Sequence, residues 1–274
     1  MTNDGSNEVH CGALGKLSLH DETTANPNDS SLETKPNIIL CDAWYGFPQQ
    51  TRPRKERICA VSRQLVNFLQ WRQCAKFGPE QCQVHLLGSE EDVTSVQQRI
   101  AYIIDKEDTS GKCIGQIHYK SNVDIHDAIQ QWRNTYSTND EVVYLSPDAS
   151  EALSPTAPPP RVVIVGMLID RRITSDRSRK RAEEYLNLRA VKLPLNELNV
   201  KEMCSEEPLN VDTVMELMQR WWTNCDKLEE IHNARKSDKM YVDPSKYREG
   251  FVKAAAFAIK SHRDRHPNRP IHKS

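Results

Sequence analysis

Apolar and polar residues alternate along the chain in two patterns, one typical of buried strands and one of amphipathic helices. Continuous apolar runs, which fit strands covered on both faces, predict strands at 37–42, 83–87, 113–118, 142–145, 162–167 and 190–193. Apolar residues at helical spacing predict helices at 54–76, 93–103, 124–132, 175–187, 209–222 and 246–260. Strands that alternate with helices in this way specify an α/β fold with a mainly parallel sheet.

Parallel sheets bind ligands at the carboxyl ends of their strands, so the residues that follow the predicted strands are the first functional candidates. Ser146 follows one strand, the segment from Gly166 to Asp170 follows another, and Pro194 stops a third. Neither GxGxxG nor GxxxxGKS/T is present, which argues against a Rossmann dinucleotide site and a P-loop. A ligand could still be held at these positions by backbone amides and carbonyls.

Charge is distributed unevenly along the 274 residues, although the net charge is only −1. Residues 1–36 carry six acidic residues against Lys16 and Lys35, and the rest of the chain is mildly basic. We expect a disordered acidic segment at 1–35, because it lacks apolar periodicity. We expect one folded domain at 36–235, followed by a C-terminal helix and a basic tail at 236–274.

The eight cysteines are scattered and no pair has CxxC spacing, so we expect reduced thiols and neither a metal site nor a disulfide framework. No apolar run approaches the ~20 residues that span a bilayer, and we expect no membrane partner. The first residues contain neither the apolar stretch of a secretory signal nor the Arg-rich composition of a mitochondrial transit peptide. We expect a nuclear or cytoplasmic location, with a mitochondrial one left open.

Fragments of the second half resemble a known family. VVYLSPDA, IVGMLID and AVKLPL follow one another, and a helix start of the form Leu-x-x-x-x-Val comes next at Leu209. Together they resemble the tRNA methyltransferases that modify N1 of the purine at position nine, a family of the SPOUT superfamily. The resemblance covers about 36–226 and is specific from Glu141 onward. It implies a mainly parallel sheet flanked by helices, with a trefoil knot near the C-terminus.

The resemblance further implies S-adenosylmethionine as the methyl donor, held in the knot mostly by backbone groups of three loops. A glycine allows close backbone approach and a proline fixes a turn, which suits Gly166 and Pro194 to such loops. Carried over motif by motif, the expected cofactor-binding residues are Leu145, Ser146, Pro147, Gly166, Met167, Leu193, Pro194, Leu195, Leu209, Asn210 and Asp212. For Asp212, an N-cap on the following helix is an equally good interpretation.

Asp170 matches the carboxylate that ends the second motif of the family. The N1 atom of guanine carries a proton that must leave when the methyl group arrives, and a nearby carboxylate could accept it. Adenine N1 already offers a lone pair, so an adenine-specific enzyme would need no base. The alternative is that Asp170 caps a turn or pairs with a neighbouring arginine.

A tRNA substrate requires a basic surface, and two runs provide candidates. They are RPRKER at 52–57 and RRITSDRSRKR at 171–181, the second directly after the motif that ends in Asp170. The expected RNA-binding residues are Arg52, Arg54, Lys55, Arg171, Arg172, Arg177, Arg179, Lys180 and Arg181. A solvated surface without a ligand is the alternative for each run.

We therefore expect an S-adenosylmethionine-dependent enzyme that methylates N1 of a purine, guanine favoured, at position 9 of tRNA. The family resemblance favours a monomer. The alternative function is a catalytically weak, tRNA-binding subunit of a processing complex with a protein partner. Two departures from the family bear on details: the short N-terminal segment is acidic where many members are Lys/Arg-rich, and Met167 stands where the family often has a second glycine.

Overall fold

The computed structural model describes residues 35–44, 47–77, 81–107, 117–168, 176–195, 209–234 and 242–265. The chain divides into Met1–Thr34 and Lys35–Ser274, and every described residue belongs to the second unit. Its centre is a six-stranded sheet in the order β3-β2-β1-β5-β4-β6. All neighbouring strands pair in parallel. The strands are β1 (Asn37–Asp42), β2 (Cys82–Gly88), β3 (Ile117–Ser121), β4 (Val142–Leu145), β5 (Val162–Gly166) and β6 (Ala190–Val191).

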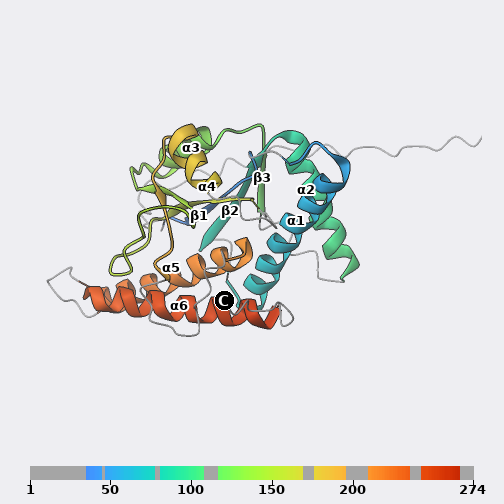
Figure 1. The fold of residues 1–274 in the computed structure, drawn as a ribbon. Helices are drawn as coiled ribbons and strands as arrows, with labels where there is room; N and C mark the ends of the chain where they lie inside the picture. The colour runs from blue at the N-terminus through green and yellow to red at the C-terminus, as the bar shows by residue number, and fades with distance from the viewer. Residues whose placement is uncertain are drawn as a thin grey trace, which may run out of the picture. The chain divides into compact units, whose positions relative to one another are not determined.

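Helices cover both faces of this sheet (Figure 1). One face carries α1 (Thr51–Cys74), α2 (Glu90–Lys106), α5 (Val211–Ala234) and α6 (Pro244–Arg265). The other face carries α3 (Ile125–Tyr136) and the segment formed by α4 (Arg177–Lys180) and a π-helical turn, η2 (Arg181–Tyr185). The predicted mainly parallel α/β fold is confirmed.

The alternation of side chains along each strand explains why the strands read as uninterrupted apolar runs. In β1, Ile39 and Cys41 enter the core beneath α1 and α5, whereas Ile38 and Leu40 enter the core beneath α3. Successive side chains of a strand point to opposite faces. In a strand with a core on each side, every position therefore faces an apolar core and favours an apolar residue. The exceptions in β1 are its two end residues, Asn37 and Asp42, which are both polar and buried.

The structure departs from the sequence prediction mainly in the segment at 175–187. The helix predicted there consists of one α-turn followed by the π-turn, in which Leu186 N donates to Arg181 O, five residues earlier. Asp176 precedes the helix with a left-handed φ of 66°, and its side chain makes no capping hydrogen bond. Asp176 therefore does not cap the helix through its side chain, and Ser175 lies outside the described residues.

The predicted knot is not tested by the part of the chain that the structure describes. Two connections near it, 169–175 after β5 and 196–208 before α5, lie outside the described residues. The knot therefore stays a prediction. Within the described ranges, no helix is long and apolar enough to cross a membrane.

Candidate active site at the carboxyl edge of the sheet

The predicted cofactor loops leave three neighbouring strands at the same edge of the sheet. Leu145 ends β4, where it pairs in register with Val165 of β5 and Val191 of β6. Gly166 ends β5, and Pro147 and the segment 193–195 follow the ends of the adjacent parallel strands β4 and β6. The fourth predicted segment, 209–212, leads into α5 on the face that α1 also covers.

The apolar side chains of these segments share one core. Leu145 and Met167 are buried in it, and Leu193, Leu195 and Leu209 pack against it while remaining partly exposed. Leu193 and Leu195 follow the end of β6, and Leu209 precedes α5. The uncovered apolar surface of the three leucines suits a flat purine ring, which takes apolar contacts on its faces and backbone partners at its edge. The residues present thus fit the adenosine part of S-adenosylmethionine.

Hydrogen bonds hold the first two loops to the sheet. Ser146 N donates to Val191 O at 2.9 Å, and Met167 N donates to Asp42 O at 2.9 Å. The Ser146 hydroxyl lies 2.7 Å from that of Ser178 in α4. Asp176 N, just before α4, donates to Asp148 Oδ2 at 2.9 Å. The loop after β4 is therefore held both to the sheet and to the start of α4.

Asp42 is a buried carboxylate at this edge that the sequence analysis did not select. It pairs in register with Gly166 and accepts hydrogen bonds from Trp44 N at 2.9 Å and from the Tyr144 hydroxyl at 3.1 Å. Arg181 Nε donates to it at 3.1 Å. Burial raises the pKa of Asp42, and the nearby Arg181 guanidinium opposes that rise. A signal was present, since NIILCD ends in an aspartate just as IVGMLID does.

Asp212 is surrounded by protein groups. It is fully buried, and its oxygens accept hydrogen bonds from Asn67 Nδ2 at 3.2 Å and Thr213 N at 2.9 Å. The N-cap interpretation is wrong, because α5 begins at Val211 and the carbonyl of Asn210 accepts from Thr213 N and Val214 N. The cofactor-binding role predicted for Asp212 stays a prediction.

The residues predicted to bind RNA differ in how exposed their side chains are. Arg181 pairs with Asp42, and Arg179 pairs with Asp176 and Glu183. Arg54 pairs with Asp92 and Glu91 of α2. Arg52, Lys55, Arg177 and Lys180 have exposed side chains, and Arg52 makes an exposed pair with Glu56. Asp170, Arg171 and Arg172 lie outside the described residues, so their roles stay predictions.

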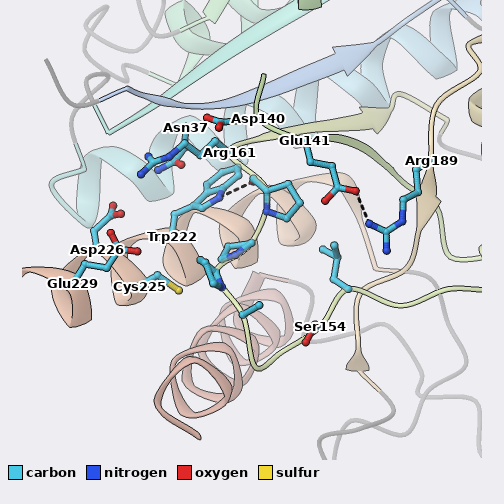
Figure 2. Close-up of a pocket in the computed structure, with 15 residues that line it drawn as sticks. Asn37, Asp140, Glu141, Ser154, Arg161, Arg189, Trp222, Cys225, Asp226 and Glu229 are labelled. Carbon is cyan, nitrogen blue, oxygen red and sulfur yellow. Dashed lines mark hydrogen bonds and ion pairs between the residues drawn. The ribbon is translucent and has the colours of Figure 1, made fainter. Parts of the chain in front are cut away.

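A cavity of about 390 Å³ lies at the opposite edge of the sheet (Figure 2). Asn37, Arg161 and Arg189, which begin or precede strands β1, β5 and β6, line it together with α5 residues such as Trp222. Among the described residues, none that was predicted to bind the cofactor or RNA lines this cavity. Within the described residues, no group of His, Cys, Asp and Glu side chains could hold a metal ion.

Comparison with solved structures gives only distant similarities. Full-length spTrm10 in its complex with SAH has 13% identity and a TM-score of 0.48, covering 80% of this chain and 96% of that one. A dual-specific Trm10 from Thermococcus kodakaraensis has 14% identity and a TM-score of 0.43, covering 80% and 99%. The yeast arginine methyltransferase SFM1, complexed with MTA, has 16% identity and a TM-score of 0.38, covering 67% and 73%.

Sequence comparison is more informative. No curated protein sequence matches the chain as a whole. A sequence model of the family described as tRNA (guanine(9)-N(1))-methyltransferase TRM10/TRM10A, however, matches residues 83–233. The match covers more than half of the chain and includes every predicted cofactor-binding residue as well as Asp170. The family predicted from the ordered motifs is confirmed: the chain belongs to the tRNA (guanine(9)-N(1))-methyltransferase TRM10/TRM10A family.

Proposed function

We propose that the edge formed by the ends of β4, β5 and β6 is where this enzyme methylates N1 of guanine 9 in tRNA, with S-adenosylmethionine as donor. The main support is the family match over 83–233. The matched range contains the predicted cofactor loops, and the parallel pairing of β4, β5 and β6 brings the loops that follow these strands to the same edge of the sheet. The solved spTrm10 holds SAH, the demethylated form of that donor. The partly exposed Leu193, Leu195 and Leu209 would cover its adenine ring.

The donor supplies a methyl group already activated on a positively charged sulfur. In the reaction the bond from guanine N1 to the methyl carbon forms, the carbon–sulfur bond breaks, and the N1 proton leaves. Asp170 is the proposed acceptor of that proton, because it follows β5 directly after the second loop. Positioning of the base against the methyl group would supply much of the remaining acceleration.

The exposed cations on α4 are the proposed first contacts for the tRNA backbone. Arg177 and Lys180 face solvent on the short helix that the Ser146–Ser178 contact ties to the loop after β4. Phosphate contacts of this kind orient a nucleic acid without reading its sequence. We further propose that the chain works as a monomer, which light scattering at micromolar concentration would test.

The test compares two tRNA transcripts that differ only in carrying guanine or adenine at position 9. With labelled donor, we expect 1-methylguanosine from the first, identified by nucleoside digestion. Failure to methylate the guanine transcript, under conditions where the protein binds it, would favour a tRNA-binding subunit without catalysis. Asp170→Asn should slow single-turnover methylation about 100-fold, within the range of general-base effects, and leave SAH affinity unchanged. Asp127→Asn, exposed on α3, is the matched control.

A further inference from the structure

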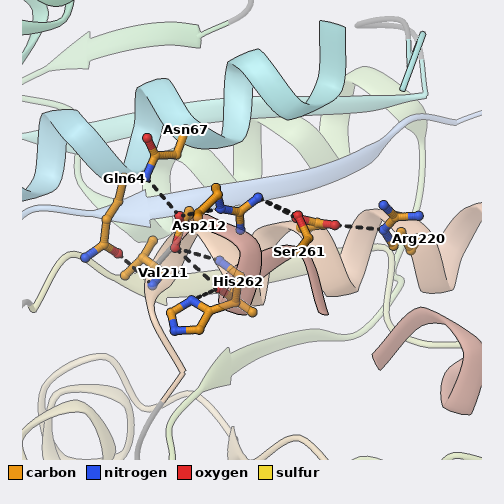
Figure 3. Close-up of polar contacts among 10 residues, drawn as sticks. Gln64, Asn67, Val211, Asp212, Arg220, Ser261 and His262 are labelled. Atoms are coloured by element: carbon orange, nitrogen blue, oxygen red, sulfur yellow. Dashed lines mark hydrogen bonds and ion pairs between the residues drawn. The ribbon is translucent and has the colours of Figure 1, made fainter. Parts of the chain in front are cut away.

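The start of α5 is held by a polar network that joins three helices (Figure 3). From α1, Gln64 Oε1 accepts from Val211 N at 2.7 Å and Asn67 donates to Asp212 at 3.2 Å. From α6, Arg265 Nη1 donates to Glu216 Oε2 at 2.9 Å, and its Nε lies 3.6 Å from Asp212 Oδ2.

The same turn of α6 adds two further contacts. His262 Nδ1 lies 2.9 Å from the Thr213 hydroxyl, and the Ser261 hydroxyl accepts from Arg265 Nη1 at 2.8 Å. Every residue of α5 from Val211 to Glu216, except Val214, is buried, so these contacts are made away from bulk water. One turn of α6 therefore touches the first turn and a half of α5.

Joining two helices through buried charged side chains costs the hydration free energy of those charges. Asp212 and Glu216 are fully buried, and their nearest cations are Arg265 for both and Arg220 for Glu216. Buried ion pairs commonly contribute less stability than apolar side chains of similar size, because both partners lose their hydration. A pair of buried carboxylates bridged by one arginine does, however, specify a single arrangement, since an apolar contact tolerates sliding and a bridging guanidinium does not.

The two helices do not need these charges in order to dock. Farther along, Trp221 of α5 packs on Phe251 of α6 with ring centroids 4.6 Å apart. Ala254, Ala255 and Ala258 are buried in the same core and let the helices approach closely. The ionic network is instead confined to the end of α5 that follows the predicted cofactor segment at Leu209 and Asn210.

We infer that Arg265 is a positioning residue for the methyl donor: by bridging Asp212 and Glu216 it fixes the register of the α5 start, and with it Leu209 and Asn210 at the site. The inference rests on the proposed function, because only there does the segment 209–210 contact a cofactor. Arg265 itself touches neither donor nor base; it acts through α5. The C-terminal helix thereby becomes part of the enzyme's binding machinery for the donor.

The experiment measures SAH affinity by calorimetry and the thermal midpoint for the full chain and four variants. Arg265→Met removes the charge and keeps the aliphatic stem, and Arg265→Lys keeps a charge that cannot bridge both carboxylates. The triple variant Arg265→Met, Asp212→Asn, Glu216→Gln removes the charges together, so that no buried carboxylate at these positions is left without a cation. Lys260→Met, exposed on α6, is the matched control.

We expect Arg265→Met to lower the thermal midpoint and weaken SAH binding about tenfold. Arg265→Lys should weaken SAH binding to a smaller extent, and Lys260→Met should change neither quantity. The triple variant should recover the midpoint while its SAH affinity stays about tenfold weak. Because this variant also alters Asp212, itself a predicted cofactor-binding residue, the deciding result combines it with Arg265→Lys, which leaves Asp212 intact and must also bind SAH more weakly than wild type. A purely structural role predicts that affinity returns with the midpoint.

Wild-type SAH affinity in the folded triple variant, or in Arg265→Lys and Arg265→Met alike, would overturn the inference. Should Arg265→Met not fold, the triple variant and Arg265→Lys decide by the same readout. Absence of SAH binding by the unaltered chain would instead count against the proposed function. Affinity for tRNA, measured in parallel, should be equal in all five proteins, because none of the substitutions touches the proposed RNA contacts.

Discussion

Three buried carboxylates, Asp42, Asp212 and Glu216, each pair with an arginine. Asp42 is matched by Arg181, and Asp212 and Glu216 by Arg265. These pairs join residues more than 45 positions apart in sequence. A run of charges such as RSRKR looks the same in sequence whether its members face phosphates or a distant carboxylate. Motif reading could therefore find the basic segment but could not tell Lys180, which faces solvent, from Arg181, which does not.

The Asp42 carboxylate gives a testable pH dependence. Its pKa is raised in the folded protein, so the folded state holds this proton at pH values where the unfolded chain, near 3.8, has released it. The stabilising contribution is greatest below that value and is lost as pH rises through the folded pKa. We expect the unfolding free energy of wild type, relative to Asp42→Asn, to fall as the pH rises above about 4. Urea titrations at several pH values measure it.

Asp127→Asn, exposed on α3, is the control for the Asp42 experiment and should show a constant difference from wild type. A difference that grows with pH would mean that attraction by Arg181 outweighs the cost of burial. The same measurement therefore ranks the two opposing effects on Asp42.

His85 should produce the opposite trend. It is buried on β2, stacks on His118 with ring centroids 4.7 Å apart, and has its pKa lowered to about 3 by burial and by nearby Lys120 and His118. In the unfolded chain the His85 imidazole binds a proton with a pKa near 6.5, whereas in the folded chain it stays neutral at this pH. The unfolding free energy therefore falls as the pH drops below 6.5. By pH 5 the loss should be about 2 kcal/mol.

Replacing His85 with Gln should remove this loss, so that unfolding free energies at pH 7.5 and pH 5 differ less than in wild type. The exposed His126 on α3 provides the control, because His126→Gln should keep the wild-type difference. An equal fall in wild type and His85→Gln would show that His85 is protonated without cost in the folded state.

At the scale of elements, a helix or strand can be predicted from sequence when its conformation is determined by the residues within it. Four of the five longer strands, β1, β2, β4 and β5, appear in sequence because each is an apolar run enclosed by helices on both faces. The fifth, β3, is an edge strand with the sequence IHYKS that is buried only at Ile117, and it overlaps the predicted strand 113–118 only at Ile117 and His118. The β6 strand is only Ala190–Val191, and its predicted extension to Leu193 is limited in the structure to a bridge at Lys192. The π-turn at 181–185 had no local signal, since it serves to bury Ala182 and Leu186 against the α3 face while Arg181 reaches Asp42.

Neighbouring cations of α4 and η2 have two different expected roles, which can be tested separately: Lys180 contacts a phosphate of the tRNA, and Arg181 pairs with Asp42. Lys180→Ala should weaken tRNA binding and reduce the slope of log affinity against log salt by about 1, because one phosphate contact is lost. Arg181→Ala should mainly lower the thermal midpoint, because it leaves Asp42 buried without its cation. Filter binding over a salt series measures the first effect, with Lys246→Ala on α6 as control. A wild-type slope in Lys180→Ala would remove α4 from the RNA surface.

At the scale of the molecule, the sheet has a core on each face, and the sequence at 1–35 shows no apolar periodicity that would predict a contribution to either. The first core depends on α6, which contributes Phe251, Ala254, Ala255 and Ala258. The sequence predicts a boundary between a folded domain at 36–235 and the C-terminal helix, because the stretch between them is polar. The apolar face of α6 is complementary to that of α5, and that relation becomes visible only when the helices are placed side by side.

Two truncations test this difference between the ends of the chain. A chain that begins at Lys35 should keep the wild-type thermal midpoint within about 3 °C, a shift that corresponds to about 1 kcal/mol in a domain of this size. A chain that ends at Val242 should lose cooperative unfolding, because Trp221 and its neighbours on α5 would be exposed to water. Phe251→Ala calibrates the second result, since it should cost about 3 kcal/mol and leave the transition cooperative. A cooperative transition in the chain without α6 would mean that β1 to α5 fold alone, and that α6 serves the start of α5 rather than the core.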